Sequence, residues 1–223
     1  MPIQYARKLT GSRRSAQANH QLGLMLAFVA GAANAGGFLA VHQYTSHMTG
    51  IVSAMADHLA LGQLRDYLAG FGALLSFIAG AACSAILVNF ARRRRLHSEF
   101  ALPLMIEALL LLGFGALGER LSHVAGLFVP LTVMLLSFIM GLQNALITKL
   151  SHAEIRTTHI TGLVTDIGIE LGKMAYWNSS DPTLPPVRAN PVRLRVLLQL
   201  AVCFFVGGVS GAIVDGRPVA AGS

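Results

Sequence analysis

The stretch Tyr67–Phe90, YLAGFGALLSFIAGAACSAILVNF, contains no charged residue and is followed almost at once by four arginines, Arg92–Arg95. Its 24 residues would form a helix of about 36 Å, which is enough to cross a hydrocarbon core about 30 Å thick. Basic residues at one end of such a stretch are typical of the cytoplasmic side of a membrane. The stretch therefore predicts a membrane-spanning helix whose carboxyl end lies inside the cell.

The composition of the whole chain indicates the same environment. Of 223 residues, 54% are hydrophobic and only 12% are charged, whereas soluble domains average about 25% charged. These values exclude an ordinary soluble enzyme and a disordered chain, and the presence of only two cysteines excludes a disulfide scaffold. The net charge is +7, but the basic residues flank apolar stretches without interleaved aromatic residues, so nucleic acid is not an expected partner.

Five apolar stretches are long enough, or nearly so, to cross a membrane as helices. They are residues 22–41, 67–90, 100–118, 124–148 and 196–214. Two further segments, 47–61 and 159–177, are shorter or carry charged side chains, which are costly in contact with lipid. These two segments predict short broken or re-entrant helices that lie against protein or water.

The distribution of basic residues favours five crossings and a cytoplasmic N-terminus. With Lys173 unassigned, this arrangement leaves only three basic residues outside: Arg65, Arg120 and Arg217. If segment 47–61 alone became a further crossing, the four arginines at 92–95 would lie outside, against the positive-inside rule. The first stretch is expected to be retained, because no small-residue cleavage site follows it.

The chain contains an internal repeat. Gly31-Ala-Ala-Asn-Ala recurs as Gly141-Leu-Gln-Asn-Ala, and Phe77-Ile-Ala-Gly is echoed by Phe205-Val-Gly-Gly. The predicted organisation is a basic cytoplasmic tail (1–21), a first membrane repeat (22–90), a basic cytoplasmic loop (91–99), a linking transmembrane helix (100–118), a short loop (119–123), a second membrane repeat (124–214) and a C-terminal tail (215–223). Because each repeat has two crossings and a single helix separates them, inverted topology is predicted.

Three motifs resemble those of the YoaK-like family, which are small bacterial integral membrane proteins grouped as a domain of unknown function. They are GAANAGGFL at Gly31–Leu39, SHMTG at Ser46–Gly50, and GLQNA at Gly141–Ala145 followed by TTHITG at Thr157–Gly162. The resemblance extends along the chain from about residue 22 to residue 214. It implies a polytopic inner-membrane protein and supplies no substrate.

The sequence departs from that family at three positions. The family usually has Asp where this chain has Asn34, and Asn where this chain has Ile51 and Leu163. Because asparagine does not titrate, the departure at Asn34 argues against a proton relay or a cation site at this position. The repeated Thr-Gly dipeptide is kept in both halves.

The strongest candidates for a binding site are two matched motifs, His47-x-Thr49-Gly50 and His159-x-Thr161-Gly162. Glycine permits unusual backbone conformations, and a helix that starts beside it presents N–H groups and a positive dipole end. An anionic or carbonyl-bearing ligand would suit such a break. The alternative is structural: the two threonines would be the N-caps of short helices, with the histidines at the aqueous boundary.

Asn34 and Asn144 occupy matched positions among small residues in two predicted spans. Their carboxamides offer donors and acceptors to a polar ligand in a cavity shared between the repeats. The alternative, which the general behaviour of asparagine in membranes favours, is hydrogen bonding between helices that only holds the bundle together.

Four acids lie within hydrophobic segments: Asp57, Glu107, Asp166 and Glu170. An ionisable residue at membrane depth predicts a function, here coupling to protons or recognition of a cation. We interpret Asp166, Asp57 and Glu107 in this way, and Asp166 lies one turn after the second Thr-Gly. Glu170 is expected to pair with Lys173, three residues further along the same helical face.

The sequence predicts no catalytic residue, no metal site and no cofactor. None of the eight histidines has the spacing of a metal motif, and Cys83 and Cys203 occupy non-equivalent positions in apolar stretches, as packing residues do. Phosphate-binding, nucleophile-elbow and dinucleotide-binding motifs do not occur. An enzyme is therefore not expected.

These features predict an all-α polytopic helix bundle of the bacterial inner membrane. Its predicted function is that of a secondary transporter or exporter of a small molecule, acting by alternating access between inverted repeats. The expected partners are the lipid bilayer and an unidentified small molecule, and a homo-oligomer is left open. The alternatives are a non-transporting scaffold or sensor and, third, an intramembrane enzyme.

Overall fold

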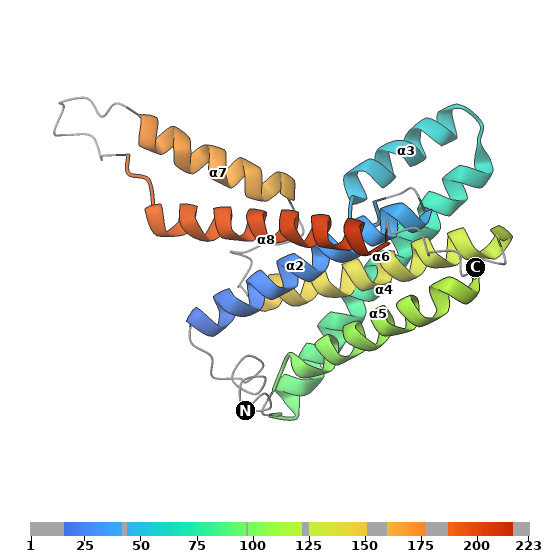
Figure 1. The fold of residues 1–223 in the computed structure, drawn as a ribbon, viewed down its shortest axis with the longest axis horizontal. Coiled ribbons are helices and arrows are strands. Elements are labelled where there is room, and N and C mark those ends of the chain that lie inside the picture. The colour runs from blue at the N-terminus through green and yellow to red at the C-terminus, as the bar shows by residue number, and fades with distance from the viewer. Residues whose placement is uncertain are drawn as a thin grey trace, which may run out of the picture.

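The computed structural model describes residues 16–41, 44–96, 98–121, 125–150, 160–176 and 187–215, and all regular structure in these ranges is helical (Figure 1). The helices are α2 (Ala16–Val41), α3 (Met48–Ala60), α4 (Leu64–Arg93), α5 (Ala101–Leu121), α6 (Ala125–Leu150), α7 (Ile160–Ala175) and α8 (Pro191–Asp215). The predicted all-α bundle is confirmed. Because α2 begins at Ala16, the end of the predicted 1–21 tail is helical.

Four helices in the described chain are long and apolar enough to cross a membrane. These spans are Gln17–Leu39 in α2, Leu64–Arg93 in α4, Val129–Lys149 in α6 and Pro191–Ile213 in α8. They correspond to four of the five predicted crossings. The fifth predicted crossing is α5, which has 21 residues and a shorter apolar part, Ala101–Ala116.

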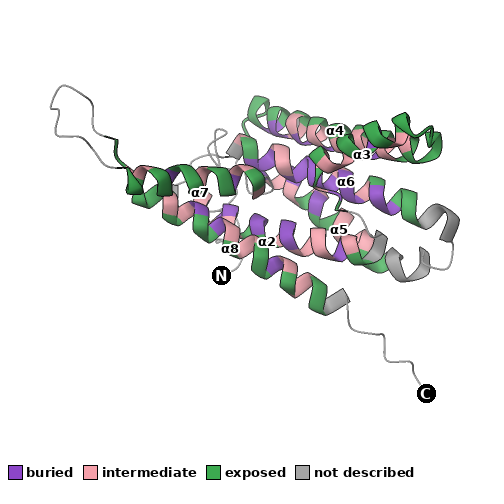
Figure 2. Cartoon of the chain, turned by 90° about the horizontal axis from the view of Figure 1, so that it is seen from above, coloured by how far each residue is buried: buried purple, intermediate pink, exposed green. Residues whose placement is uncertain are grey.

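The outer surfaces of these helices carry large apolar side chains. Ile86, Leu112 and Phe205 are exposed by 67%, 69% and 71%. Exposed residues also line the outer sides of the helices in Figure 2, where they are green. Soluble proteins do not expose apolar surface on this scale, whereas hydrocarbon tails solvate it, so these faces contact the lipid bilayer.

Two pairs of helices cross at close range through the same motif, Phe-x-x-Gly. In α2 and α8 the motifs are Phe28–Gly31 and Phe204–Gly207, and a Cβ added at either glycine would collide with the carbonyl oxygen of the phenylalanine in the other helix. The motifs Phe77–Gly80 in α4 and Phe138–Gly141 in α6 make the same reciprocal contact. Only a residue without a side chain lets two backbones approach this closely.

These crossings correct the register of one predicted match. Gly141 lies against Phe77 as Gly31 lies against Phe204, so the counterpart of Phe77 is Phe204. The predicted match of Phe77 with Phe205 is therefore wrong by one residue. The error arose because this part of α8 contains two adjacent phenylalanines and two adjacent glycines, so the sequence alone allows both registers.

Contacts along α2 and α8 show that these two helices are parallel. Gly207 lies against Phe28, and one turn later Gly211 lies against Ala32. The helices α4 and α6 are parallel as well. In their first halves the hydroxyl of Ser76 donates to the carbonyl of Met134 at 2.7 Å, and near their ends Lys149 donates to Asn89 at 3.2 Å.

The remaining contacts show which helices run in the opposite direction. The side chain of Gln143 in α6 donates to the carbonyl of Leu26 in α2 at 3.1 Å, whereas Leu136, earlier in α6, contacts Gly37, later in α2. α2 and α6 are therefore antiparallel. The start of α5 packs on the ends of α4 and α6 in one cluster that includes Phe100, Val88 and Leu146, so α5 is antiparallel to both.

The short helices α3 and α7 each begin part-way along the long helices and run back along one of them. Ile51 of α3 packs with Ala73 and Val133, about nine residues or roughly 13 Å into α4 and α6. Leu163 of α7 packs with Leu200, which lies equally far into α8. In Figure 1 both short helices begin near the middle of the long axis and diverge toward its opposite ends.

Candidate functional site

A small polar cluster connects the end of α2 to the start of α3. The Ser46 hydroxyl donates to the carboxamide oxygen of Asn34 at 2.8 Å, and the rings of Phe38 and Tyr44 stack with centroids 4.5 Å apart. Thr45, which lies between Tyr44 and Ser46 in the chain, is 1% exposed. The Asn34 side chain therefore fixes the turn that follows its own helix, and the predicted bond of Asn34 to another span is replaced by this bond to Ser46.

His47 and Gly50 are in direct contact at the first Thr-Gly break. A Cβ added at Gly50 would collide with the His47 imidazole, so the glycine provides the space that the ring occupies. His47 and Thr49 are both exposed. The sequence prediction grouped these three residues, and the structure brings them together at the first turn of α3.

The structural alternative for Thr49, that it caps α3, is wrong. His47 is the N-cap and makes no side-chain capping bond, while Thr49 is the second residue of the helix. The first bond of the helix runs from the Ile51 N–H to the His47 carbonyl at 3.1 Å. The N–H groups of Thr49 and Gly50 precede this bond, at the helix end where N–H groups commonly receive a ligand.

The second Thr-Gly break lies at the start of α7. His159 falls outside the described residues, while Thr161 is exposed and Gly162 is half-buried. Thr161 is again the second residue of its helix, and its carbonyl accepts a hydrogen bond from the Thr165 hydroxyl at 2.8 Å. The two threonines thus hold matching positions at the starts of the two short helices.

Asn144 and its neighbour Gln143 have different environments. Asn144 is half-buried, and its backbone carbonyl accepts a hydrogen bond from the Thr148 hydroxyl at 2.8 Å. Gln143 is fully buried and bonds to the backbone of α2, as described above. The repeat gives no signal for Gln143, because its counterpart in the first repeat is Ala33 and only shared residues stand out when the repeats are aligned.

The acids differ sharply in their partners. Asp57 is exposed at the end of α3. Asp166 pairs with Arg193 at 3.2 Å, and Glu170 pairs with Lys173 at 2.9 Å, which confirms the pair predicted for Glu170. The sequence did not reveal the partner of Asp166, because Arg193 belongs to another helix.

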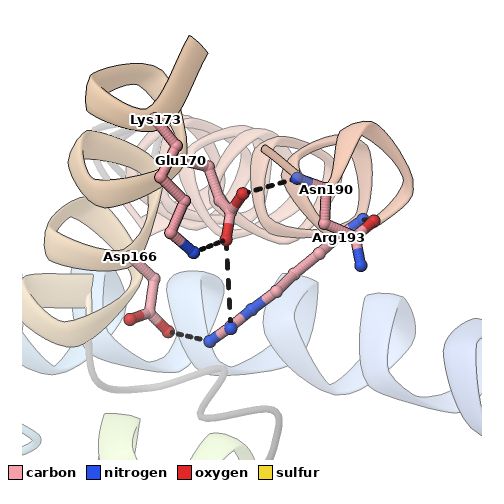
Figure 3. A network of polar contacts seen from close by, with 5 residues as sticks. All are labelled: Asp166, Glu170, Lys173, Asn190 and Arg193. Carbon is pink, nitrogen blue, oxygen red and sulfur yellow. Dashed lines mark hydrogen bonds and ion pairs between the residues drawn. The ribbon is translucent and has the colours of Figure 1, made fainter. Parts of the chain in front are cut away.

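Figure 3 shows these charges as one network between α7 and α8. The backbone N–H of Asn190 donates to Glu170 at 2.7 Å, and Arg193 approaches the same carboxylate at 4.0 Å. The Asn190 side chain in turn accepts the Arg193 N–H at 3.0 Å, as an N-cap does, and Pro191 follows it at the first helical position. We call Asp166, Glu170, Lys173, Asn190 and Arg193 the charge clamp.

The charge clamp stabilises the ionised form of Glu170, which lies outside the four candidate spans. The Asn190 N–H and the Lys173 ammonium hold the pKa of this carboxyl below its ordinary value of 4.5, against the opposing effect of its burial. Its side chain is only 2% exposed because the partners themselves cover it. Glu170 is thus a structural anion that fastens α7 to α8.

Within the described residues no group of three or more His, Cys, Asp or Glu side chains is placed to hold a metal ion. Cys83 and Cys203 are both free and half-buried. They lie in α4 and α8, the last helices of the two predicted repeats.

The apolar outer faces and the long apolar helices define the class of the chain: it is an integral membrane protein made of transmembrane helices. It belongs to the family described as "Protein of unknown function (DUF1275)", whose profile matches residues 22–222. The chain is similar to the UPF0700 transmembrane protein YoaK of Bacillus subtilis (strain 168), with 26% identity over 195 residues that cover 86% of this chain and 81% of the relative. No solved structure matches it.

Proposed function

We propose that the protein is a secondary transporter of a small molecule, built from two inverted repeats in the bacterial inner membrane with its N-terminus in the cytoplasm. The single observation that carries this proposal is the placement of α3 and α7. Both begin with a matched Thr-Gly near the middle of the bundle and run toward opposite ends. Paired interrupted helices at mid-membrane depth are a recurrent site of substrate binding in transporters.

The helix directions support five crossings for this proposal. Successive crossings must alternate in direction, and α2, α4, α5, α6 and α8 do so when α3 and α7 are left out. Each short helix would then belong to a re-entrant segment, which enters and leaves the membrane at the same face. The two units α2–α4 and α6–α8 have opposite directions, as inverted repeats require.

The substrate would bind at the two breaks, where the exposed hydroxyls of Thr49 and Thr161 and the first N–H groups of α3 and α7 are available. The remaining residues of the proposed site are Asn34, His47, Gly50, Asn144, His159 and Gly162. N–H groups at a helix start favour an anionic or carbonyl-bearing substrate. Asp57, Glu107 and Asp166 are the candidates for coupling.

Alternating access would move one helix group against another. One group is α2, α7 and α8, and the other is α3, α4, α5 and α6, because the Phe-x-x-Gly crossings hold α2 to α8 and α4 to α6. The hydrogen bond from Gln143 to Leu26 lies between the two groups. We propose that this α2–α6 contact is where the groups rock.

A scaffold or sensor is the second candidate function. The observation in its favour is the apolar outward face of the two short helices, where Val52, Leu59, Val164 and Leu171 are exposed. Another membrane protein would cover such a face as well as lipid does. The transporter is preferred because it also accounts for the matched Thr-Gly breaks.

Replacing Thr49 and Thr161 together by Val tests the site. The full chain is reconstituted in liposomes loaded with a small-molecule extract of a bacterial cytosol, and mass spectrometry identifies the compounds that leave. We expect the double variant to lose this flux, and the control Thr148→Val to keep it, because the Thr148 hydroxyl bonds only within its own helix. Unchanged flux in the double variant contradicts the site, and absence of any flux favours the scaffold or sensor.

The proposed orientation is tested separately with one cysteine. Arg93→Cys is introduced after Cys83 and Cys203 have been replaced by Ala, and intact cells are treated with an impermeant thiol reagent. We expect labelling only after the cells are opened, because Arg93 lies at the end of α4 that the proposal places inside. Labelling of intact cells would reverse the proposed topology.

A further inference from the structure

Glu107 stands apart from every other acid in the described residues. It lies in the second turn of α5, its side chain is 3% exposed, and neither carboxyl oxygen has a hydrogen-bond partner in the described part of the chain. An ionised carboxylate without a partner is very costly in such surroundings, whereas a neutral carboxyl group is tolerated. The burial of Glu107 therefore requires that the group hold a proton or another cation.

The packing around α5 places two further buried polar groups at the same level. Phe100 and Leu104 pack with Val88 of α4 and Leu146 of α6, at the end where these three helices meet. One turn further from that end are Glu107 in α5, Ser84 in α4 and Gln143 in α6. The Ser84 hydroxyl and the Gln143 carboxamide oxygen are also buried and without a hydrogen-bond partner among the described residues.

The charged groups of the neighbouring helices are engaged elsewhere. On α4, Arg92 pairs with Glu99 at 2.8 Å, and on α6 Lys149 donates to Asn89 at 3.2 Å. These groups lie at the shared end, and Glu107 lies about 9 Å from the start of its own helix. Two other titratable groups lie on the helices packed here: Cys83, next to Ser84 in α4, and His20 in α2, whose Nδ1 is buried without a hydrogen-bond partner among the described residues. His20 lies at the shared end, because Leu22 and Leu26 of α2 belong to the same cluster as Phe100 and Leu146. The acid and base of α5 itself, at 119 and 120, are about three turns away.

We propose that Glu107 is the proton-binding group of the transporter, with Ser84 and Gln143 as its polar surroundings. This inference rests on the proposed function. The step is the reversible ionisation of the carboxyl group: the O–H bond breaks, the electron pair stays on the carboxylate oxygen, and the proton passes to water at the end of the bundle that carries Arg92. A movement of the two helix groups that admits water to Glu107 would release the proton.

Asp57 and Asp166, the other candidates for coupling, are less suited to be the main proton site. Asp166 already has a cationic partner, Arg193, at 3.2 Å. The Asp57 side chain is exposed. Glu107 alone among the three is enclosed and without a partner in the described chain. Only an enclosed group can carry a proton through a conformational change without exchanging it with water on both sides.

The first experiment measures protonation directly and needs no substrate. Infrared spectra of the full chain in lipid nanodiscs are recorded over a range of pH values, for the wild type and for Glu107→Gln. We expect the wild type to show the carbonyl stretch of a protonated carboxyl group at neutral pH, and the variant to lack that band. In Ser84→Ala the band should remain but change frequency, because a buried hydroxyl at the same level of α4 has gone. Identical spectra of wild type and Glu107→Gln would overturn the inference.

A second measurement uses only the wild-type protein, in case the variant does not fold. Dicyclohexylcarbodiimide adds to protonated carboxyl groups in apolar surroundings, and the modified residue is identified by mass spectrometry. We expect modification at Glu107 that declines as the pH rises. Modification of Asp57 or Asp166 with Glu107 untouched would contradict the inference.

The third experiment separates this inference from the proposed function. Flux of a compound identified in the liposome assay is measured with and without a pH gradient, in Glu107→Gln, Asp57→Asn and Asp166→Asn. We expect a response to the gradient in the last two variants and none in Glu107→Gln. A response that survives in Glu107→Gln overturns the coupling role alone. No flux of any compound, together with a titrating Glu107, overturns the transporter and leaves the proton-binding group.

Discussion

The hairpins α3–α4 and α7–α8 occupy corresponding places in the fold but are held together by different chemistry. When the short helices are aligned on Gly50 and Gly162, His58 corresponds to Glu170. When the long helices are aligned on Gly80 and Gly207, Gln63 corresponds to Asn190. The first pair is joined by a bond of 2.6 Å between His58 and the Gln63 side chain. The second is joined by the Asn190 N–H and the Glu170 carboxylate at 2.7 Å. Matched positions thus close both hairpins, through two side chains in the first and through a backbone N–H and a carboxylate in the second.

The difference extends to the packing of each short helix. Met55 of α3 is 8% exposed and lies directly over Gly70 of α4, where a Cβ would be 2.6 Å from the Met55 Cγ. In α7, by contrast, the charge clamp provides the contacts at the outer end. Both hairpins have apolar contacts, but beyond these the first depends on the fit of Met55 over Gly70 and the second on the charge clamp. Conditions that weaken charge interactions should loosen α7 and leave α3 in place.

The largest effect should come from removing what both halves share. Gly80→Leu and Gly207→Leu would each force a side chain into the backbone of the partner helix, and we expect each to lower the free energy of unfolding by about 3 kcal/mol or more. Reversible unfolding in mixed micelles measures this quantity. The control Gly113→Ala, with no atom within 4 Å of the added Cβ, should be neutral or slightly stabilising. A large loss in only one of the two leucine variants would break the equivalence of the crossings.

A smaller effect should separate the first hairpin from the second. Met55→Ala removes the side chain that fills the space over Gly70, and we expect a loss of about 2 kcal/mol with faster hydrogen exchange in α3. Hydrogen exchange in α7 should not change. The control is Val52→Ala, because Val52 lies in the same helix with an exposed side chain. Equal loosening of both short helices would contradict the independent packing of the two hairpins.

The reciprocal change acts on the charge clamp. Glu170→Gln keeps an oxygen that can accept the Asn190 N–H but removes the charge that attracts Lys173 and Arg193. We expect severalfold faster hydrogen exchange in α7 and no change in α3. In the first hairpin the matched change His58→Leu should have little effect, since that pair is exposed. If α7 kept its protection in Glu170→Gln, the charge clamp would not be what holds it.

The smallest effect is the response of the charge clamp to acid. Because the pKa of Glu170 is lowered in the folded chain, its carboxylate stabilises the fold above the ordinary value of 4.5, and this contribution disappears as the pH falls through the lowered value. The difference in Tm between wild type and Glu170→Gln should therefore be largest at neutral pH and become smaller in acid. A difference that stays constant across this range would show that Glu170 acts through shape alone.

The helices themselves could be predicted closely, because long apolar stretches bounded by charge leave little choice in a membrane. The Thr-Gly breaks were predicted as well, since they recur in both halves. Three things could not be derived. Two of them are the pairing of Arg193 with Asp166 and the register of Phe204, because contacts between different helices decide both. The third is the burial of Glu107, because a rotation of α5 by half a turn decides whether a side chain faces lipid or protein.

The exchange of partners between the two halves has a consequence for biosynthesis. α2 is the first described helix to leave the ribosome, yet the helix against which it crosses, α8, is the last. Gly31 and its neighbours therefore present an unfilled backbone surface until α8 has been translated. α4 waits only for α6, so the centre of the protein can assemble first. A chain cut short before α8 would keep α2 without its partner, and such a chain is a natural target for the proteases that remove incomplete membrane proteins.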